Sequence, residues 1–380
     1  MTFAFDTLDA LGPDWRTARW IGRIDRGEGP TPVIVAGGIV FDMSKVAPTV
    51  AELVARDLLD PTAGEAIGDL DTLGLSVGGV PRLLSPIDVQ CVKAAGVTFA
   101  VSALERVIEE QARGDAGAAT AVRARLEDRI GGGLARVVPG TPEAAALKTA
   151  LIEEGLWSQY LEVAIGPDAE IFTKAPSLST VGWGADIGVR SDSTWNNPEP
   201  EIVLLVAPDA RIVGATIGND VNLRDFEGRS ALLLGKAKDN NASCSLGAFI
   251  RLFDDSFTID DVRRAEVALR IEGTDGYVLD GASSMSQISR DPEELVRQAL
   301  SEHQYPDGFV LFLGTLFAPT KDRDDVGRGF THKTGDTVAI AAPGLGRLIN
   351  TVTTSKAAAP WEFGLVALMR NLAARGLLSA

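Results

Sequence analysis

The stretch PEPEIVLLVAPDARIVGATIGND, residues 198–220, decides the fold. Two apolar runs flank a short polar segment, and this pattern predicts a β-hairpin whose turn is centred on Asp209 and Ala210. Pairing that is symmetric about this turn puts Glu199 opposite Asp220, on one face of the hairpin. A loop one residue longer or shorter would reverse the faces, so this register is a hypothesis.

A third carboxylate joins this pair, because Glu201 lies two residues after Glu199 and side chains two apart on a strand share a face. Like charges held this close require a cation or a proton. No His or Cys lies nearby, so the set is typical of an all-oxygen site for Mg²⁺, Mn²⁺ or Ca²⁺ rather than zinc. The alternative is that these acids are solvated strand ends or pair with Arg211 and Arg224.

Bulk composition limits the classes of function. The 380 residues predict about two or three domains. With 36 basic and 52 acidic residues the net charge is −16, which disfavours nucleic acid and anionic membranes and favours a small-molecule partner. No apolar run is long enough to span a bilayer, and Asp6 and Asp9 stand where a signal peptide would be basic, so a cytoplasmic protein is expected. Cys91 and Cys244 are expected to be buried thiols.

The first 82 residues predict a small α/β domain. Residues 31–44 are strand-like, and residues 49–59 predict a helix that begins with Thr49 and Glu52 in capping-box spacing. The Gly- and Pro-rich passage GLSVGGVPRLLSP then marks a domain boundary.

Residues 83–380 predict a second domain in an α+β fold. We expect a helical insertion over 102–157, which is either a lid or an oligomer surface. Its first helix begins at Ser102, with Glu105 in capping-box spacing, and further helices are expected at about 117–130 and at 141–157. Short β-rich runs follow, and their spacing fits a closed or sandwiched β architecture better than a doubly wound one. Residues 361–378, WEFGLVALMRNLAARGLL, predict an amphipathic helix for packing or oligomer contact.

Four motifs resemble the fumarylacetoacetate hydrolase superfamily in order and spacing: PEPEIVLLV, GATIGNDVNLRDFEG, KAKDNNASCSLGAF and FVLFLGTLFAP. The resemblance covers about residues 83–350, and implies a mixed β-sandwich or roll as the catalytic domain. It also implies that Glu199, Glu201 and Asp220 hold one divalent metal, usually Mg²⁺, which chelates a 2-oxo acid. Lys238, rather than Lys236, would pair with the anionic oxygens of the substrate. Members are commonly homodimers or homotetramers.

Departures from the family pattern narrow the choice of activity within the family. Hydrolases of the family use a histidine to activate water, and the equivalent stretch GVTFAVS has Ser102 at that position. Serine cannot deprotonate water near neutral pH, so carbon–carbon bond hydrolysis is disfavoured. Ser102 either contacts substrate or caps its helix. His303 and His332 lie far downstream and are assigned no role, and His332 is expected to be a solvated loop residue. Asn222 replaces the usual serine after NDV, which would alter a pocket contact.

GVTFAVS, AEIFTKA and KAKDNNASCSLG together look like the sugar-acid branch of the family, the 2-keto-3-deoxy-pentonate dehydratases. This resemblance implies Glu170 as the base. Thr315 matches a position that often binds the substrate carboxylate, with a plain strand-end threonine as the alternative.

The predicted function is therefore Mg²⁺-dependent dehydration, with Mn²⁺ as an alternative metal. A 2-keto-3-deoxy-D-pentonate from xylonate or arabinonate would become 2,5-dioxopentanoate in oxidative pentose degradation. The alternatives within the superfamily are an acylpyruvate hydrolase and an oxaloacetate decarboxylase. The alternative from another class is a non-catalytic 2-oxo-acid binding protein.

Overall fold

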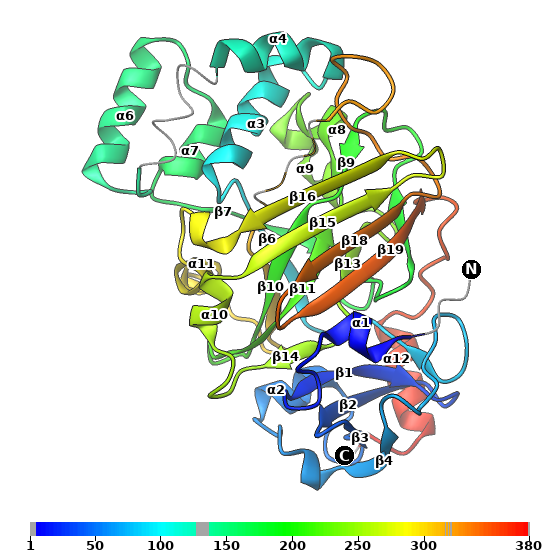
Figure 1. The fold of residues 1–380 in the computed structure, drawn as a ribbon. Coiled ribbons are helices and arrows are strands. Elements are labelled where there is room, and N and C mark those ends of the chain that lie inside the picture. The colour runs from blue at the N-terminus through cyan, green and yellow to red at the C-terminus, as the bar shows by residue number, and fades with distance from the viewer. Residues whose placement is uncertain (1–4, 127–136, 316, 318, 320, 379–380) are drawn as a thin grey trace.

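The hairpin predicted over residues 198–220 is present in the middle of the largest sheet (Figure 1). It consists of β10 (Pro200–Val206) and β11 (Ile212–Asp220), which pair antiparallel. The structure is a computed structural model that describes residues 5–126, 137–315, 317, 319 and 321–378.

The register of the hairpin is the predicted one. Glu201 pairs with Gly218, and the Asp220 N–H donates to the Glu199 carbonyl at 3.0 Å, which places Glu199 opposite Asp220. An irregularity after Leu205 adjusts the strands next to the turn, so it does not disturb the pairing at the glutamate end.

Twelve strands make up the largest sheet in the described part of the chain. Its order is β4-β3-β2-β1-β14-β11-β10-β17-β6-β7, with β13 pairing β11 and β5 pairing β1. The bounds of the strands besides β10 and β11 are β1 (Trp20–Asp25), β2 (Pro30–Ala36), β3 (Ile39–Asp42), β4 (Glu65–Asp69), β5 (Arg82–Leu83), β6 (Cys91–Gly96), β7 (Glu170–Ala175), β13 (Cys244–Leu246), β14 (Ile250–Leu252) and β17 (Phe309–Phe312).

A second sheet of five strands packs against the first (Figure 1). Its order is β16-β15-β18-β19-β8, and β9 and β12 form a separate pair. The bounds are β8 (Asp186–Val189), β9 (Asn196–Asn197), β12 (Asn222–Leu223), β15 (Glu266–Glu272), β16 (Val278–Ser284), β18 (Thr337–Ala342) and β19 (Gly346–Thr354). Two packed sheets with helices outside them are the mixed α+β sandwich that the sequence predicted.

Strand β10 is buried on both faces, which explains its continuous apolar sequence. Ile202 and Leu204 pack in the core between the two sheets, whereas Val203 and Leu205 pack in a second core on the opposite face. Helix α2 covers part of that second core.

Helices surround the two sheets. Their bounds are α1 (Thr7–Leu11), α2 (Val50–Ala55), α3 (Ala100–Gln111), α4 (Ala116–Leu126), α6 (Pro142–Glu153), α7 (Gln159–Ile165), α8 (Arg224–Glu227), α9 (Leu234–Lys238), α10 (Ile259–Arg263), α11 (Pro292–Leu300) and α12 (Leu365–Ala374), with single 3₁₀ turns η1 (Pro61–Ala63), η3 (Ala231–Leu233) and η4 (Met285–Gln287). None of the helices in the described ranges is long and apolar enough to cross a membrane.

The predicted helical insertion is present as α3, α4, α6 and α7, which share a core of their own at one end of the molecule (Figure 1). The helix predicted over 141–157 ends at Glu153, and α7 was not predicted. The helix predicted over 117–130 is observed to Leu126, and its last residues, 127–130, lie outside the described part.

Two predictions for the N-terminal region are corrected. Residues 31–44 do not form one strand, because Gly37 and Gly38, with φ of 60° and 84°, turn the chain between β2 and β3. Thr49 does cap α2, accepting from the Glu52 N–H at 3.1 Å, but the Glu52 side chain pairs with Arg56 instead of closing the box.

The N-terminal strands continue the large sheet through β1, β14 and β11, so hydrogen bonding crosses the boundary predicted near residue 82. Helix α12 returns to the same region, where Asn371 Nδ2 donates to the Glu28 carbonyl at 2.7 Å and Arg375 donates to the Pro30 carbonyl at 2.8 Å. The division into domains 1–82 and 83–380 stays a prediction.

The close approach of β14 to β11 makes one glycine necessary. A Cβ at Gly214 would lie 2.2 Å from the Arg251 carbonyl oxygen, so Gly214→Ala forces backbone apart and should destabilise the fold by about 1–3 kcal/mol. Gly235→Ala is the matched control, because nothing lies within 4 Å of the added Cβ. We expect thermal unfolding followed by circular dichroism to show a lower Tm for the first variant only. Equal Tm values would contradict this packing.

Candidate active site

The three predicted metal-ligating carboxylates converge at the end of the hairpin. Glu199, Glu201 and Asp220 are 4 %, 2 % and 1 % exposed. One oxygen of each can be chosen so that all lie within 4.8 Å of one another. Burial rules out solvated strand ends, so the cluster requires compensation from inside the protein.

The alternative partners suggested by the sequence do not supply that compensation. Arg211 pairs with Asp57 and Asp209 on the surface, and Arg224 pairs with Glu109. Neither arginine forms an ion pair with the cluster in the described residues.

Two buried lysines neutralise the cluster instead. Lys238 Nζ lies 2.5 Å from Glu199 Oε2 and 3.0 Å from Asp220 Oδ2, and these two charges outweigh burial and raise the pKa of Lys238. Lys174, which the sequence analysis did not single out, is fully buried and lies 2.7 Å from Asp220 Oδ1. Lys236 is exposed and stacks over the ring of Phe226. The choice of Lys238 over Lys236 for the cavity therefore agrees with the geometry.

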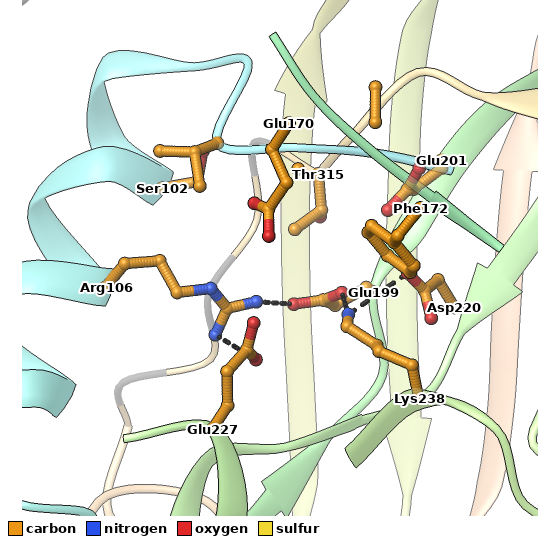
Figure 2. A pocket seen from close by; sticks show the side chains of 13 residues that line it. Ser102, Arg106, Glu170, Phe172, Glu199, Glu201, Asp220, Glu227, Lys238 and Thr315 are labelled. Atoms are coloured by element: carbon orange, nitrogen blue, oxygen red, sulfur yellow. Dashed lines mark hydrogen bonds and ion pairs between the residues drawn. The ribbon is translucent and has the colours of Figure 1, made fainter. Parts of the chain in front are cut away.

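Arg106 is a further cation that the sequence analysis missed. Its Nη2 lies 2.6 Å from Glu199 Oε1, and its Nη1 lies 3.1 Å from Glu227 Oε2 (Figure 2). The same Nη1 lies 2.7 Å from Glu109 Oε2. Arg224 Nε lies 3.2 Å from the other oxygen of Glu109. These ion pairs connect α3, α8 and the start of β10.

The spacing of residues on α3 was the signal for Arg106. Ser102, Arg106 and Glu109 recur at intervals of four and three residues, so they share one helical face. Val107 and Ile108 lie on another face and pack in the helical core. The apolar face of α3 predicts the helix, whereas its polar face carries the signal for Arg106.

Glu170 begins β7 and lies opposite Gly96 of β6. A Cβ at Gly96 would lie 2.1 Å from Glu170 Oε2, so the carboxylate lies directly over this glycine. Burial, followed by the negative charge of Glu227, raises the pKa of Glu170 to about 7. A carboxyl with such a pKa can accept or return a proton near neutral pH.

Arg290 fixes the chain just before Glu170. This buried arginine donates from Nη2 to the carbonyls of Val163 and Gly166, both at 2.8 Å, and to the carbonyl of Asp168 at 3.3 Å. It thereby satisfies carbonyls at the end of α7 and holds the turn that leads into β7.

Ser102 lines the cavity and is not the N-cap of its helix, but its side chain bonds the N-cap backbone from the third helical position. Helix α3 begins two residues earlier, with Phe99 as its N-cap, and Ser102 Oγ exchanges hydrogen bonds with the Phe99 backbone, donating to its carbonyl at 2.8 Å. The predicted partner Glu105 pairs with Arg123 instead.

Thr315 also lines the cavity, directly after Gly314, whose N–H donates to Glu201 Oε2 at 2.7 Å. Asn222, in contrast, is fully buried in β12 opposite Asn197 and is not part of the cavity wall. Its predicted effect on a pocket contact is therefore not direct.

The expectation for His332 is wrong. Its side chain is buried, and its Nδ1 lies 3.3 Å from Asp336 Oδ2. Burial lowers the pKa of His332. Asp336 also pairs with Arg323. His303 is exposed and stacks on Tyr305. Neither histidine lines the cavity, in agreement with the absence of an assigned role.

The buried charges around the cavity do not balance. The cations are Arg106, Lys174, Arg224 and Lys238, and the carboxylates are Glu109, Glu170, Glu199, Glu201, Asp220 and Glu227. This set leaves two negative charges uncompensated, which one divalent cation would neutralise. Burial and the negative charges of Asp220 and Glu199 together raise the pKa of Glu201 well above its usual range, because like charges crowd this carboxyl. The donor set and its charge therefore fit a hard divalent metal.

Of these groups, seven line one cavity (Figure 2): Arg106, Glu170, Glu199, Glu201, Asp220, Glu227 and Lys238. The metal-type cluster and Lys238 lie at one side, and Arg106, Glu170 and Glu227 lie around the rest. Such a cavity is suited to a small polar anion that is held by a metal and has an acid–base group beside it.

Comparison with known proteins identifies the family. Residues 152–353, more than half of the chain, match the family described as fumarylacetoacetate (FAA) hydrolase C-terminal. The chain belongs to the fumarylacetoacetate hydrolase family. The family resemblance inferred from the four motifs is therefore confirmed.

Two curated relatives in this family carry related names. A probable 2-keto-3-deoxyxylonate dehydratase of Haloferax volcanii is 29 % identical over 314 residues, which cover 82 % of this chain and 87 % of the relative. A 2-dehydro-3-deoxy-D-arabinonate dehydratase of Saccharolobus solfataricus is 32 % identical over 183 residues, which cover 48 % of this chain and 58 % of that protein.

Solved structures support the fold. A 2-keto-3-deoxy-D-arabinonate dehydratase complexed with magnesium and 2,5-dioxopentanoate superposes with a TM-score of 0.60 at 21 % identity, covering 88 % of this chain and 99 % of that one. A 5-carboxymethyl-2-hydroxymuconate delta-isomerase from Mycobacterium smegmatis superposes with a TM-score of 0.53 at 21 % identity, covering 88 % and 98 %. At these identities the likeness concerns the fold of the fumarylacetoacetate hydrolase family.

The charge imbalance predicts a distinctive response to Glu201→Gln. Removing one of three crowded negative charges should raise the Tm of the metal-free protein and abolish the further rise that Mg²⁺ gives to the unaltered chain. Loss of a residue that only hydrogen-bonds to a metal ligand weakens metal binding by roughly 10- to 100-fold. Loss of the ligand Glu201 itself should weaken Mg²⁺ binding by at least as much.

The measurement is thermal unfolding across a Mg²⁺ titration, supported by calorimetry. Glu266→Gln, the same change at an exposed carboxylate of β15, is the control and should leave both quantities unchanged. A Glu201→Gln protein that still gains stability from Mg²⁺ like the unaltered chain would show that these acids do not hold the metal.

Proposed function

We propose that this protein catalyses the Mg²⁺-dependent dehydration of 2-keto-3-deoxy-D-pentonate to 2,5-dioxopentanoate, in the oxidative degradation of xylose or arabinose. The observation that carries the proposal is the placement of Glu170, a carboxyl whose pKa is raised to about 7, in one cavity with Lys238 and the three-carboxylate cluster. The names of the curated relatives, both dehydratases of such sugar acids, support it.

Magnesium held by Glu199, Glu201 and Asp220 would supply a Lewis acid that chelates the 2-oxo acid and acidifies the hydrogen on carbon 3. Glu170 removes that hydrogen as a proton, because its carboxyl lines the cavity and has a pKa raised to about 7. Lys238 stabilises the negative charge that develops on the 2-oxo oxygen. Thr315 and Ser102, on the cavity wall, are proposed to contact the substrate.

The remaining steps follow from the composition of the product. The electron pair from the broken C3–H bond forms a C3–C4 double bond as the C4–O bond breaks, and the hydroxyl leaves with one proton as water. Loss of a proton from carbon 5 and return of one to carbon 3 then give an enol at carbon 5. Its tautomer is the aldehyde of 2,5-dioxopentanoate.

The geometry disfavours the hydrolytic alternative. Ser102 Oγ is occupied by the Phe99 backbone, and no histidine lines the cavity, so the described residues offer no group in the position that activates water in the hydrolases. A decarboxylase needs no proton abstraction from carbon 3, and a binding protein needs no base at all. Neither would explain a partnerless carboxyl with a pKa near neutrality in the cavity.

Other predictions remain open to direct measurement. A homodimer or homotetramer stays a prediction. The subunit contact would bury exposed apolar side chains in and next to α12: Trp361, Leu365, Val366 and Met369. A cytoplasmic location also stays a prediction.

The proposed function is tested by incubating the purified protein with 2-keto-3-deoxy-D-pentonate and Mg²⁺, and following the products by proton NMR. We expect the aldehyde of 2,5-dioxopentanoate to appear, and to be absent when excess EDTA is present. Consumption of oxaloacetate or an acylpyruvate in parallel reactions, without any dehydration, would contradict the proposal and point to another branch of the family.

The role of Glu170 predicts a pH dependence. The base must be deprotonated, so kcat/KM should fall about tenfold per pH unit below its pKa, with the midpoint of this acid limb at or below about 7 because a bound cation favours the carboxylate. Glu170→Gln should lower kcat by about 10²- to 10⁴-fold and retain Mg²⁺ binding. A variant that keeps most of its activity, or an unaltered acid limb, would exclude Glu170 as the base.

A further inference from the structure

Glu227 is a second carboxylate that opens onto the cavity, and the mechanism above gives it no task. It is the last residue of α8 and is 2 % exposed. Tyr160 Oη donates to its backbone carbonyl at 3.1 Å, which joins α7 to the end of α8. The position of its backbone is therefore fixed from two helices, while its side chain extends into the cavity (Figure 2).

The ion pairs of Arg106 distinguish Glu227 from its neighbours. Three carboxylates share this arginine, and Glu109 has Arg224 as a second cation, whereas Glu199 has Lys238. Among the described residues, Glu227 has Arg106 as its one ion-pair partner, at 3.1 Å, which is the longest of the three contacts. Among these three carboxylates, Glu227 therefore loses the least ion pairing when it holds a proton.

Glu170 and Glu227 enter the cavity from opposite sides (Figure 2). Glu170 comes from β7, and Glu227 comes from α8, with the guanidinium of Arg106 beside both. A substrate bound between them presents one face to each carboxylate.

We propose that Glu227 is the general acid that protonates the departing 4-hydroxyl group, on the face of the substrate opposite Glu170. This inference rests on the proposed function. It assigns the elimination an anti geometry, because the proton and the hydroxyl leave from opposite faces.

The proton balance closes with these two groups. Glu170 takes the proton from carbon 3, the released electron pair forms the C3–C4 double bond, and the C4–O bond breaks as oxygen receives the proton of Glu227 and leaves as water. The Glu227 carboxylate, now beside carbon 5, takes a proton from that carbon. Glu170 returns its proton to carbon 3, so both groups regain their starting states.

The negative charge of the substrate accounts for the proton that Glu227 holds when the reaction begins. With a divalent cation counted, the buried charges of the cavity cancel, and the substrate carboxylate then adds one negative charge. Burying an uncompensated charge is unfavourable, so binding retains one proton on the facing carboxylates. The negative charge of Glu227 contributes to the raised pKa of Glu170, so the proposal assigns the retained proton to this pair of carboxyls.

The test separates the two chemical steps in a Glu227→Gln protein. Exchange of the carbon 3 hydrogens with solvent deuterium, followed by proton NMR, reports the base step alone. We expect this exchange to continue in Glu227→Gln while dehydration falls by about 10²- to 10⁴-fold. In Glu170→Gln both should be lost.

A substrate analogue with fluorine in place of the 4-hydroxyl sharpens the test, because fluoride leaves without taking a proton. Glu227→Gln should eliminate fluoride within about tenfold of the unaltered rate, the loss of a general acid being specific to the hydroxyl. Glu109→Gln is the matched control, because it alters another carboxylate on the same Nη1 of Arg106, outside the cavity wall. It should change both substrates by the same factor.

Three outcomes would overturn the proposal. In the first, Glu227→Gln slows both substrates equally, which is the behaviour of a residue that only positions Arg106. In the second, Glu227→Gln dehydrates the natural substrate at the unaltered rate. In the third, the unaltered protein shows neither carbon 3 exchange nor product, which overturns the proposed function together with this inference. Tm and Mg²⁺ binding of each variant identify a folding defect, and Glu227→Asp, which keeps an acid, should then restore part of the dehydration.

Discussion

The site depends on mutual neutralisation of charges that the fold has removed from water. Three carboxylates at the end of one hairpin are nearly inaccessible, and they are tolerated because cations from other segments reach them: Lys174 from β7 and Lys238 from α9. An isolated buried carboxylate costs several kcal/mol, so the strands and helices around the cavity must stay together to keep these contacts. The remaining excess of negative charge makes a divalent cation part of the same balance.

Arg106 extends this balance to the helical segment. Because it contacts Glu199 on the sheet and Glu109 and Glu227 on the helices, the position of α3 over the sheet is coupled to the state of the metal-type cluster. The backbones of α3 and α8 come close enough that a Cβ at Gly114 would lie 2.6 Å from the Asp225 carbonyl oxygen. Close helix packing and shared ion pairs thus act on the same interface.

Different surroundings give the two similar side chains Glu201 and Glu170 different chemical properties. Glu201 and Glu170 are both glutamates at the cavity, yet Glu201 lies among other carboxylates, whereas Glu170 lies over Gly96 without a hydrogen-bond donor among the described residues. Crowded like charges suit a metal ligand, and isolation from water suits a base that titrates near neutral pH. The fumarylacetoacetate hydrolase fold supports both environments because the ends of β7, β10 and β11 open onto one cavity.

The sequence by itself determined the hairpin, its register and the convergence of Glu199, Glu201 and Asp220, because strand alternation and turn position are local properties. It also identified Lys238 and Glu170, through the family resemblance. Only the tertiary structure decided which cations meet the acids: Arg106 precedes Glu199 by 93 residues, and no local pattern specifies such a contact. For the same reason it alone buried His332, placed Glu227 opposite Glu170, and joined the N-terminal strands to the central sheet.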